Sequence, residues 1–515
     1  MKKKPTRIPN TIQETASWIQ DQLGASPDII LRAYSAEGAG AERVVLVYID
    51  SLVDNDTVNS KIVRPIQELS EEAFERFDER GLYALMKDRI LGVGSIAEID
   101  TFDHVIQSLL EGNTIILVDG YQTALAAQTA GGDERGVEEP TSQTVIRGPK
   151  EGFTENIKTN MSLLRRRIKS PKLRFVQQKI GEVTQTSVVI VYLDGIANQK
   201  IVKEITRRLS TIDTDSILES GYIEEFIQDR TYTPFPTLQN SERPDGIAAG
   251  ILEGQIAIIV DGTPFVLLAP VTFNRFFQSS EDYYQRFDIA SFLRLIRYGS
   301  FLASMLLPSL YIAITTFHQE MIPTTLLISL AAQREGTPFP AIVEAFIMEI
   351  TFEVLREAGV RMPRAIGSAI SIVGALVLGQ AAVQAGLVSA AMVIVVSFTA
   401  IANFVIPSMN MAAASRLIRF GLMILGGTFG LFGIMSGLMF MLIHMAGLRS
   451  FGIPYLLPVS PLSINNLKDV FIRAPWWRMS KRPTLVSEPE AETRQGKSQK
   501  PEPPNTDPAH EGDRG

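Results

Sequence analysis

Cysteine is missing from all 515 residues of the chain. Its absence excludes disulfides, thiolate zinc sites and thiol nucleophiles. Histidine is scarce as well, with four residues that lie far apart in the sequence. No His-Glu-x-x-His pattern, phosphate-binding glycine loop or nucleophile elbow occurs. We therefore expect no metal site, no cofactor and no enzymatic activity.

An excess of positive charge is also absent, because the formal net charge is −7. Nucleic-acid binding needs a basic surface, so we exclude that class of partner. The basic opening MKKKPTRIPN is followed by neither an apolar segment nor a small-residue cleavage site, which predicts that it is not a signal peptide. We expect the N-terminal region to remain cytoplasmic.

Charge of either sign disappears between residues 365 and 415, whereas charged residues are dense up to about Arg297. A transmembrane helix needs about 20 apolar residues, so this stretch has room for two spans with a turn near residues 384–386. The change in composition predicts a soluble region followed by a multi-pass membrane domain. We therefore expect the membrane domain to contact a lipid bilayer.

The soluble half contains an internal duplication. VVLVYID at residues 44–50 matches VVIVYLD at 188–194, and EGNTIILVDG at 111–120 matches EGQIAIIVDG at 253–262. In each copy a buried strand, a helical pattern and an Asp-Gly hairpin turn follow in the same order. A phosphate or metal loop at Asp-Gly is the alternative, but the surrounding motif for it is missing. Two related α/β subdomains are predicted.

The expected fold class is an α/β N-terminal region of two related subdomains, followed by an all-α membrane domain of about five spans plus a re-entrant or broken helix. The expected boundaries are a polar extension at 1–24, subdomain 1 at 25–146, a basic loop and helix at 147–180, subdomain 2 at 181–288, the membrane domain at 289–475 and a disordered tail at 476–515.

Between the subdomains lies RGPKEGFTEN at residues 147–156, followed by a helix with a run of basic residues. Such a run is commonly a solvated face. The alternative is contact with anionic headgroups or with an acidic partner surface. The interaction candidates are Arg147, Lys150, Glu151, Arg165, Arg166 and Arg167.

In the membrane part the first span is expected at about residues 297–317. Residues 321–333 are too few for a span and predict the broken helix. The next helix, about 341–358, carries Glu344, Glu349, Glu353 and Arg356, and the last three fall within an arc of about 60°. Carboxylates at membrane depth are costly, so a cation pathway is one interpretation. An interfacial helix with an internal Glu353–Arg356 pair is the other.

Small residues recur every four positions in the charge-free stretch, at Gly367, Ser371, Ala375 and Gly379. Such a stripe predicts close helix packing, within or between subunits, and its alternative use is to line a pore. We expect it to support a homo-oligomer. A second glycine series lies within residues 420–448, which we expect to cross the bilayer once, leaving the final crossing open.

Several ordered motifs resemble the GerA family of spore germination proteins, A subunit, over about residues 25–482. They include RGPKEGFTEN at 147–156, ERPD at 242–245, DGTPF at 261–265, MIPTT at 321–325 and SFGIPY at 450–455. Lys150 stands where arginine is commoner in the family. The resemblance implies a germinant receptor in the inner membrane of an endospore, with a permease-like B subunit and a lipoprotein C subunit. It also implies an oligomer that turns nutrient binding into ion release.

A stand-alone secondary transporter of a small solute is the alternative, because such proteins bind substrate at interrupted helices. It predicts a repeat within the membrane part, but the duplication is confined to the soluble half.

Overall fold

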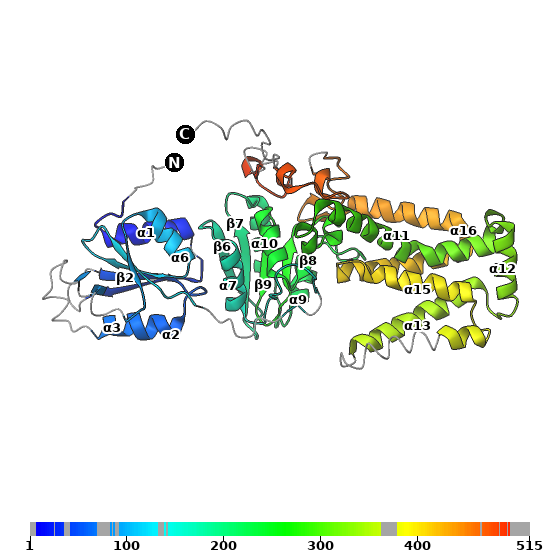
Figure 1. The fold of residues 1–515 in the computed structure, drawn as a ribbon, viewed down its shortest axis with the longest axis horizontal. Helices are drawn as coiled ribbons and strands as arrows, with labels where there is room; N and C mark the ends of the chain where they lie inside the picture. Colours follow the sequence, from blue (N-terminus) through cyan, green and yellow to red (C-terminus); the bar gives the residue numbers. More distant parts are fainter. Residues whose placement is uncertain are drawn as a thin grey trace, which may run out of the picture.

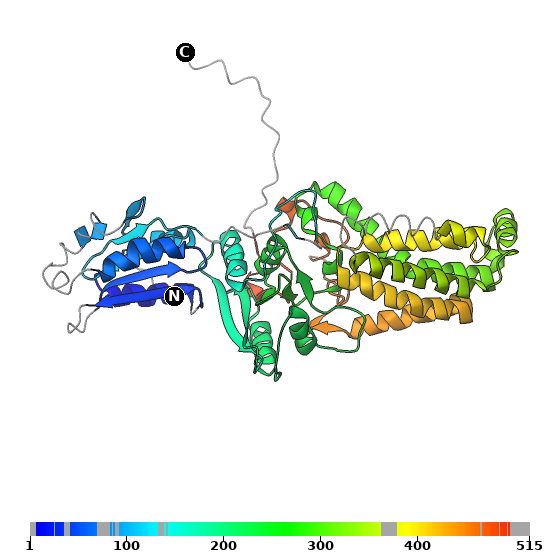
Figure 2. The ribbon, with the colours of Figure 1, turned by 90° about the horizontal axis from the view of Figure 1, so that it is seen from below.

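A computed structural model describes residues 7–494, apart from 25, 36–41, 69–82, 85, 88–91, 132–138, 141–142, 362–378, 464–465, 484 and 492. The molecule is elongated, with two α/β subdomains in a row at one end and a helical bundle at the other (Figure 1). The side view shows the bundle helices lying along the same long axis (Figure 2).

Subdomain 1 is an antiparallel five-stranded sheet with helices on both faces (Figure 1). Its elements are α1 (Ile12–Leu23), β1 (Ile29–Ser35), β2 (Glu42–Ile49), α2 (Asn55–Val58), a π-helical turn (Asn59–Val63), α3 (Arg64–Gln67), β3 (Ile96–Ile99), α6 (Phe102–Leu110), β4 (Thr114–Val118) and β5 (Ala124–Ala127). The strand order is β1-β2-β4-β5-β3. The prediction of a polar extension at 1–24 is wrong, because Ile12, Ile19 and Leu23 of α1 are buried in the core of this sheet.

Subdomain 2 repeats this plan with the strand order β6-β7-β9-β10-β8, as the duplication predicts. Its elements are α7 (Ile157–Arg167), β6 (Leu173–Ile180), β7 (Thr186–Leu193), α8 (Gln199–Ser210), α9 (Ser220–Ile227), β8 (Gln239–Ser241), α10 (Pro244–Leu252), β9 (Ile256–Val260) and β10 (Val266–Ala269). The basic segment expected as a separate connection at 147–180 therefore belongs to this subdomain, since β6 is an edge strand of its sheet.

The two Asp-Gly turns join β4 to β5 and β9 to β10, as predicted. Gly120 and Gly262 have φ of 82° and 87°, a region that favours glycine. Each aspartate also accepts a hydrogen bond from the first turn of a helix: Asp119 Oδ1 lies 3.4 Å from Ile12 N, and Asp261 Oδ1 lies 3.2 Å from Ile157 N. The repeated unit thus includes the helix before the first strand, which the sequence comparison did not reveal.

The bundle consists of α11 (Phe287–Phe317), α12 (Thr324–Arg334), α13 (Ala341–Arg361), α15 (Ala390–Phe404) and α16 (Met409–Gly447). Among the described residues, α11 and α16 are long and apolar enough to cross a membrane, and α15 is a shorter apolar helix. The 11-residue α12 has no buried residue. It lies across the far end of the bundle rather than re-entering it (Figure 1).

Helix α16 folds back on itself at Gly430, where φ is 63° and ψ is −144°. A Cβ placed on Gly437, in the second arm, would lie 2.8 Å from the side chains of Leu422 and Leu425 in the first arm. In a straight helix, Gly437 would be about 18 Å or more from both leucines. Met445, near the end of the second arm, shares a hydrophobic cluster with Met411 at the start of the first. The expected single crossing at 420–448 is therefore wrong, because a glycine in the left-handed region permits a reversal that hydropathy does not reveal.

After α16 the chain forms a short hairpin of β11 (Arg449–Ser450) and β12 (Ile453–Pro454) and then returns to subdomain 2. Ser487 pairs with Ala197, the Glu488 side chain accepts a hydrogen bond from Gln199 N, and Arg494 forms an ion pair with Glu253. The described residues of the expected disordered tail, which lie between 476 and 494, therefore contact subdomain 2 instead of extending away from it.

Candidate functional site

The carboxylates of α13 face two arginines on the first arm of α16. Glu353 Oε2 lies 2.6 Å from Arg416 Nη1, and Glu353 Oε1 lies 3.3 Å from Arg419 Nη2. Glu349 is fully buried, with Oε2 at 3.2 Å from Arg419 Nη1. Spacings of three and four residues place each pair on one helix face, so the two faces meet. We call these four residues the glutamate–arginine network.

The network is charge-balanced but incompletely hydrogen-bonded. Neither oxygen of Glu349 has a hydrogen-bond partner among the described residues, although the Arg419 guanidinium is in ion-pair contact. Arg419 is shared between two carboxylates, while Glu353 is shared between two arginines. Burying charges is costly unless they are paired, so this arrangement favours keeping α13 and α16 together.

Glu344 and Arg356, predicted with the same stripe, lie outside this network. Glu344 is at the other end of α13, where Ser389 donates to Oε2 from its backbone N (3.2 Å) and its Oγ (3.0 Å), and Thr337 Oγ1 donates to Oε1 (3.2 Å). Glu353 pairs with α16 instead of with Arg356, so the expected internal pair is wrong. The reason is that α16 brings two guanidinium groups within reach of the same carboxylate.

Of the expected packing stripe, Gly367, Ser371 and Ala375 lie outside the described residues. A Cβ at Gly379 would meet Val393 of α15 at 3.6 Å, an ordinary contact. The second glycine series packs inside the α16 hairpin and against α11: a Cβ at Gly433 would clash with Leu425 of the first arm, and one at Gly426 would come within 2.9 Å of Ser309 O on α11.

The basic residues after the connecting loop form contacts within the chain. Arg165 is fully buried and binds Asp28 through two hydrogen bonds, Nε–Oδ2 at 2.8 Å and Nη2–Oδ1 at 2.9 Å. Its guanidinium also lies over the ring of Phe175, 4.5 Å from the centroid. Arg165 therefore connects α7 to the first subdomain, and neither a solvated face nor headgroup contact describes it.

The other interaction candidates are partly exposed. Arg166 donates to Gly131 O, and Arg167 pairs with Glu151 at 2.6 Å. Lys150 pairs with Glu139 at 3.6 Å, and the backbone N of Arg147 donates to Glu281.

A second charged cluster, which the sequence did not reveal, anchors the start of α11. Arg294 is fully buried between Asp282 and Asp469, at 2.8 Å from each, and Arg297 also contacts Asp282 at 2.8 Å. Tyr283 donates to Asp469 at 2.7 Å. Burial, followed by the charge of Asp469, raises the pKa of Tyr283 well above its usual value, so the phenol stays protonated and donating.

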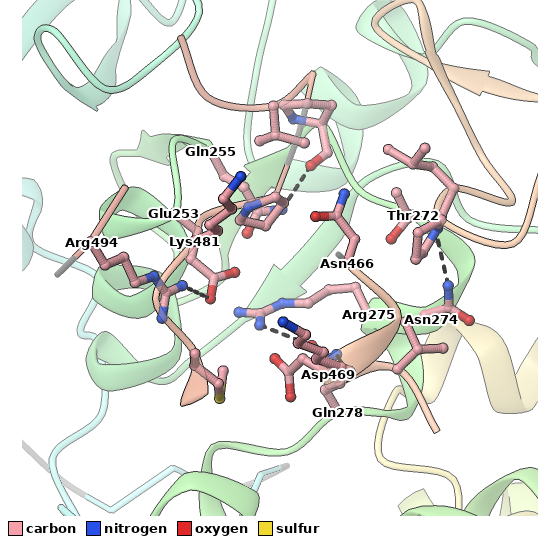
Figure 3. Close-up of a pocket in the computed structure, with 18 of the residues that line it drawn as sticks. Glu253, Gln255, Thr272, Asn274, Arg275, Gln278, Asn466, Asp469, Lys481 and Arg494 are labelled. Carbon is pink, nitrogen blue, oxygen red and sulfur yellow. Dashed lines mark hydrogen bonds and ion pairs between the residues drawn. The ribbon is translucent and has the colours of Figure 1, made fainter. Parts of the chain in front are cut away.

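Beside this cluster a small cavity of about 170 Å³ separates the C-terminal segment from subdomain 2. Figure 3 shows Arg494 pointing toward Glu253 on one side, with Asp469 beside Arg275 and Gln278 on the other. Gln278 Nε2 donates to the backbone O of Asp469 at 2.7 Å. The contacts therefore connect subdomain 2, the C-terminal segment and α11.

Comparison with known proteins identifies close relatives along nearly the whole chain. The family model described as Bacillus/Clostridium GerA spore germination protein matches residues 17–485. Spore germination protein KA of Bacillus subtilis strain 168 is 47% identical over 98% of this chain and 91% of its own length. Spore germination protein GerLA of Bacillus cereus is 39% identical over 94% of this chain and 97% of its own.

Similarity is also found to a chain of known structure. It is the N-terminal domain of the A subunit of the Bacillus megaterium spore germinant receptor GerK3, which is 37% identical, with a TM-score of 0.41, and covers 53% of this chain and 99% of that chain. The family-model match and the full-length relatives agree with the motifs quoted above. The chain belongs to the GerA family of spore germination proteins.

Proposed function

We propose that this chain is the A subunit of a spore germinant receptor that converts nutrient binding into cation release across the endospore inner membrane. It acts as a homo-oligomer, together with a permease-like B subunit and a lipoprotein C subunit, and has no enzymatic activity of its own. The observation that carries the proposal is the glutamate–arginine network, whose Glu349 and Arg419 are buried within a largely apolar bundle of a germination-family chain.

The network supports a gate rather than an open path. Arg419 lies against both carboxylates, so a cation could bind Glu349 only after this guanidinium moves away. A shift of α16 relative to α13 would do this, and the hairpin at Gly430 keeps both arms of α16 together during such a shift. The buried junction around Arg294 offers a route by which the soluble region could drive it.

The proposed topology places α11, α13, α15 and both arms of α16 in the bilayer, with the soluble region and the C-terminal segment on the cytoplasmic side. An apolar, outward-facing surface on these helices supports this: Phe429, Phe432, Met439 and Phe440 are each at least 64% exposed. Thr233 of the soluble region contacts His444, near the end of the second arm, at 2.9 Å, so that arm returns to the cytoplasmic side.

The test is potassium release from spores that carry Glu349→Gln or Glu353→Gln at normal receptor levels. We expect nutrient-triggered release to be strongly slowed. Glu357→Gln is the matched control, since Glu357 is on the same helix, is 64% exposed and pairs only with Arg361 among the described residues. Release at the control rate in both variants would remove these carboxylates from the pathway.

A further inference from the structure

A cavity of about 610 Å³ lies where the soluble region meets the bundle. One wall comes from β8, α10 and the residues just before α11, and includes Arg243, Asp245 and Tyr284. The opposite wall comes from the end of α13 and from the turn between α15 and α16. The cavity is therefore at the level where the bundle helices end on the side of the soluble region (Figure 1).

Asp245 and Glu253, the carboxylates of the soluble wall, are already paired. Arg243 Nη2 lies 2.6 Å from Asp245 Oδ2, and the same oxygen accepts a hydrogen bond from the Tyr284 hydroxyl at 2.7 Å. Glu253, also in the lining, is paired with Arg494. None of these carboxylates is left to neutralise a cation from the bundle.

Among the described lining residues, Arg356 is the cation that the bundle contributes to this cavity. Within the described residues its guanidinium has neither an ion pair nor a hydrogen bond, and the nearby Glu353 is already engaged by Arg416 and Arg419. Arg275 lies on the soluble side of the cavity. Among the described residues, its guanidinium donates only to the side chains of Gln239 and Gln278 and to a backbone carbonyl. In the described part of the chain, neither guanidinium group forms an ion pair with a carboxylate, and two such groups lining one cavity favour an anionic ligand.

The bundle wall is apolar and continues out of the cavity. Val360, Phe404 and Met409 line it and are 75%, 69% and 61% exposed. Along α15, exposed side chains recur at Ile401, Phe398 and Ile394, three or four residues apart, so they extend one track from Phe404 toward the middle of the bundle. A hydrocarbon chain could follow this track, whereas a small soluble anion would leave it uncovered.

We infer that this cavity binds an anionic phospholipid, with the phosphate at Arg356 and Arg275 and one acyl chain along Phe404, Ile401 and Phe398. Basic pockets at the cytoplasmic ends of membrane helices are suited to such headgroups. The bound lipid would join the soluble region to α13 beside the glutamate–arginine network. The inference does not depend on whether the chain releases cations.

The test is native mass spectrometry of the purified full chain in detergent with phosphatidylglycerol. We expect retained lipid in the wild type and at least about tenfold weaker retention in Arg356→Gln, the usual scale for losing a charged hydrogen bond. Arg361→Gln is the control: Arg361 lies five residues further along α13, is 78% exposed and pairs with Glu357 outside the cavity. It should retain lipid like the wild type.

Three further arms make the outcome decisive. Met409→Trp fills the apolar wall without changing charge, and we expect weaker retention from it. Equal retention by Arg356→Gln and Arg361→Gln, or equal binding of phosphatidylcholine, would overturn the inference. Displacement of phosphatidylglycerol by glycerol phosphate at equal concentration would also overturn the inference, because the acyl track would then contribute nothing to the binding affinity.

Discussion

The buried Arg165–Asp28 pair offers a quantitative test of how the two subdomains are held together. Asp28, just before β1, belongs to subdomain 1, and Arg165 lies in the last turn of α7. Asp28→Asn removes the charge but keeps the shape. Arg165 would then remain fully buried, with its guanidinium facing an amide and the ring of Phe175.

The expected loss follows from burial. Removing one partner of a buried ion pair typically destabilises a protein by about 3–5 kcal/mol, because the other charge stays desolvated. A second pair across the same boundary provides the control: Lys158 Nζ lies 2.9 Å from Asp50 Oδ2, but the lysine side chain is 72% exposed. Lys158→Gln should cost no more than about 1 kcal/mol.

The assay is urea unfolding of the soluble region, monitored by circular dichroism and compared at one protein concentration. We expect Asp28→Asn to lower the free energy of unfolding by about 3–5 kcal/mol. The double variant Asp28→Leu/Arg165→Met should recover most of that loss, since neither charge remains buried. If Asp28→Asn and Lys158→Gln have the same small effect, the argument from burial is refuted.

Three other outcomes are expected. Asp261→Asn should leave the free energy of unfolding nearly unchanged, because asparagine keeps the oxygen that accepts the hydrogen bond from Ile157 N. Asp261→Ala should lower it by about 1 kcal/mol. Equal losses in the two variants would show that the charge itself matters. Burial, followed by the charges of Glu219 and Glu225, raises the pKa of Glu224 to about 7. The stability of the fold should therefore fall as pH rises from about 4.5 to about 7. In thermal melts, Glu224→Gln should make stability less dependent on pH over this range. Because the chain has no cysteine, the double variant Met411→Cys/Met445→Cys can be cross-linked specifically at these two positions. The α16 hairpin predicts an efficient cross-link within one chain, since Met411 and Met445 share a hydrophobic cluster. A straight α16 would give no such cross-link.

The soluble fold could be predicted from the sequence because its signals are local and repeated. Two matched strand segments were enough to predict two related subdomains, and Asp-Gly after an apolar strand predicted both hairpins. The contribution of α1 to the first subdomain was missed, because its apolar residues are widely spaced and follow a basic opening.

The bundle could be predicted only in part, because the positions of its helices depend on contacts that hydropathy does not encode. The stripe on α13 marked charged residues at one face, but its partners on α16 could not be identified from the spacing of residues along the sequence. The reversal at Gly430 depends on one backbone conformation within a helical segment of 39 residues. The buried position of Arg294 could not be predicted either, since nothing local to it indicates Asp469, 175 residues away.

The most direct test of the proposed function is the current through the purified receptor complex in a planar bilayer under a potassium chloride gradient. With nutrient present, carboxylates on the pathway predict a reversal potential near that of potassium, and Glu349→Gln/Glu353→Gln should reduce both conductance and cation selectivity while Glu357→Gln does not. A reversal potential near that of chloride, or currents identical in all three proteins, would contradict the proposal that the network lies on the cation pathway.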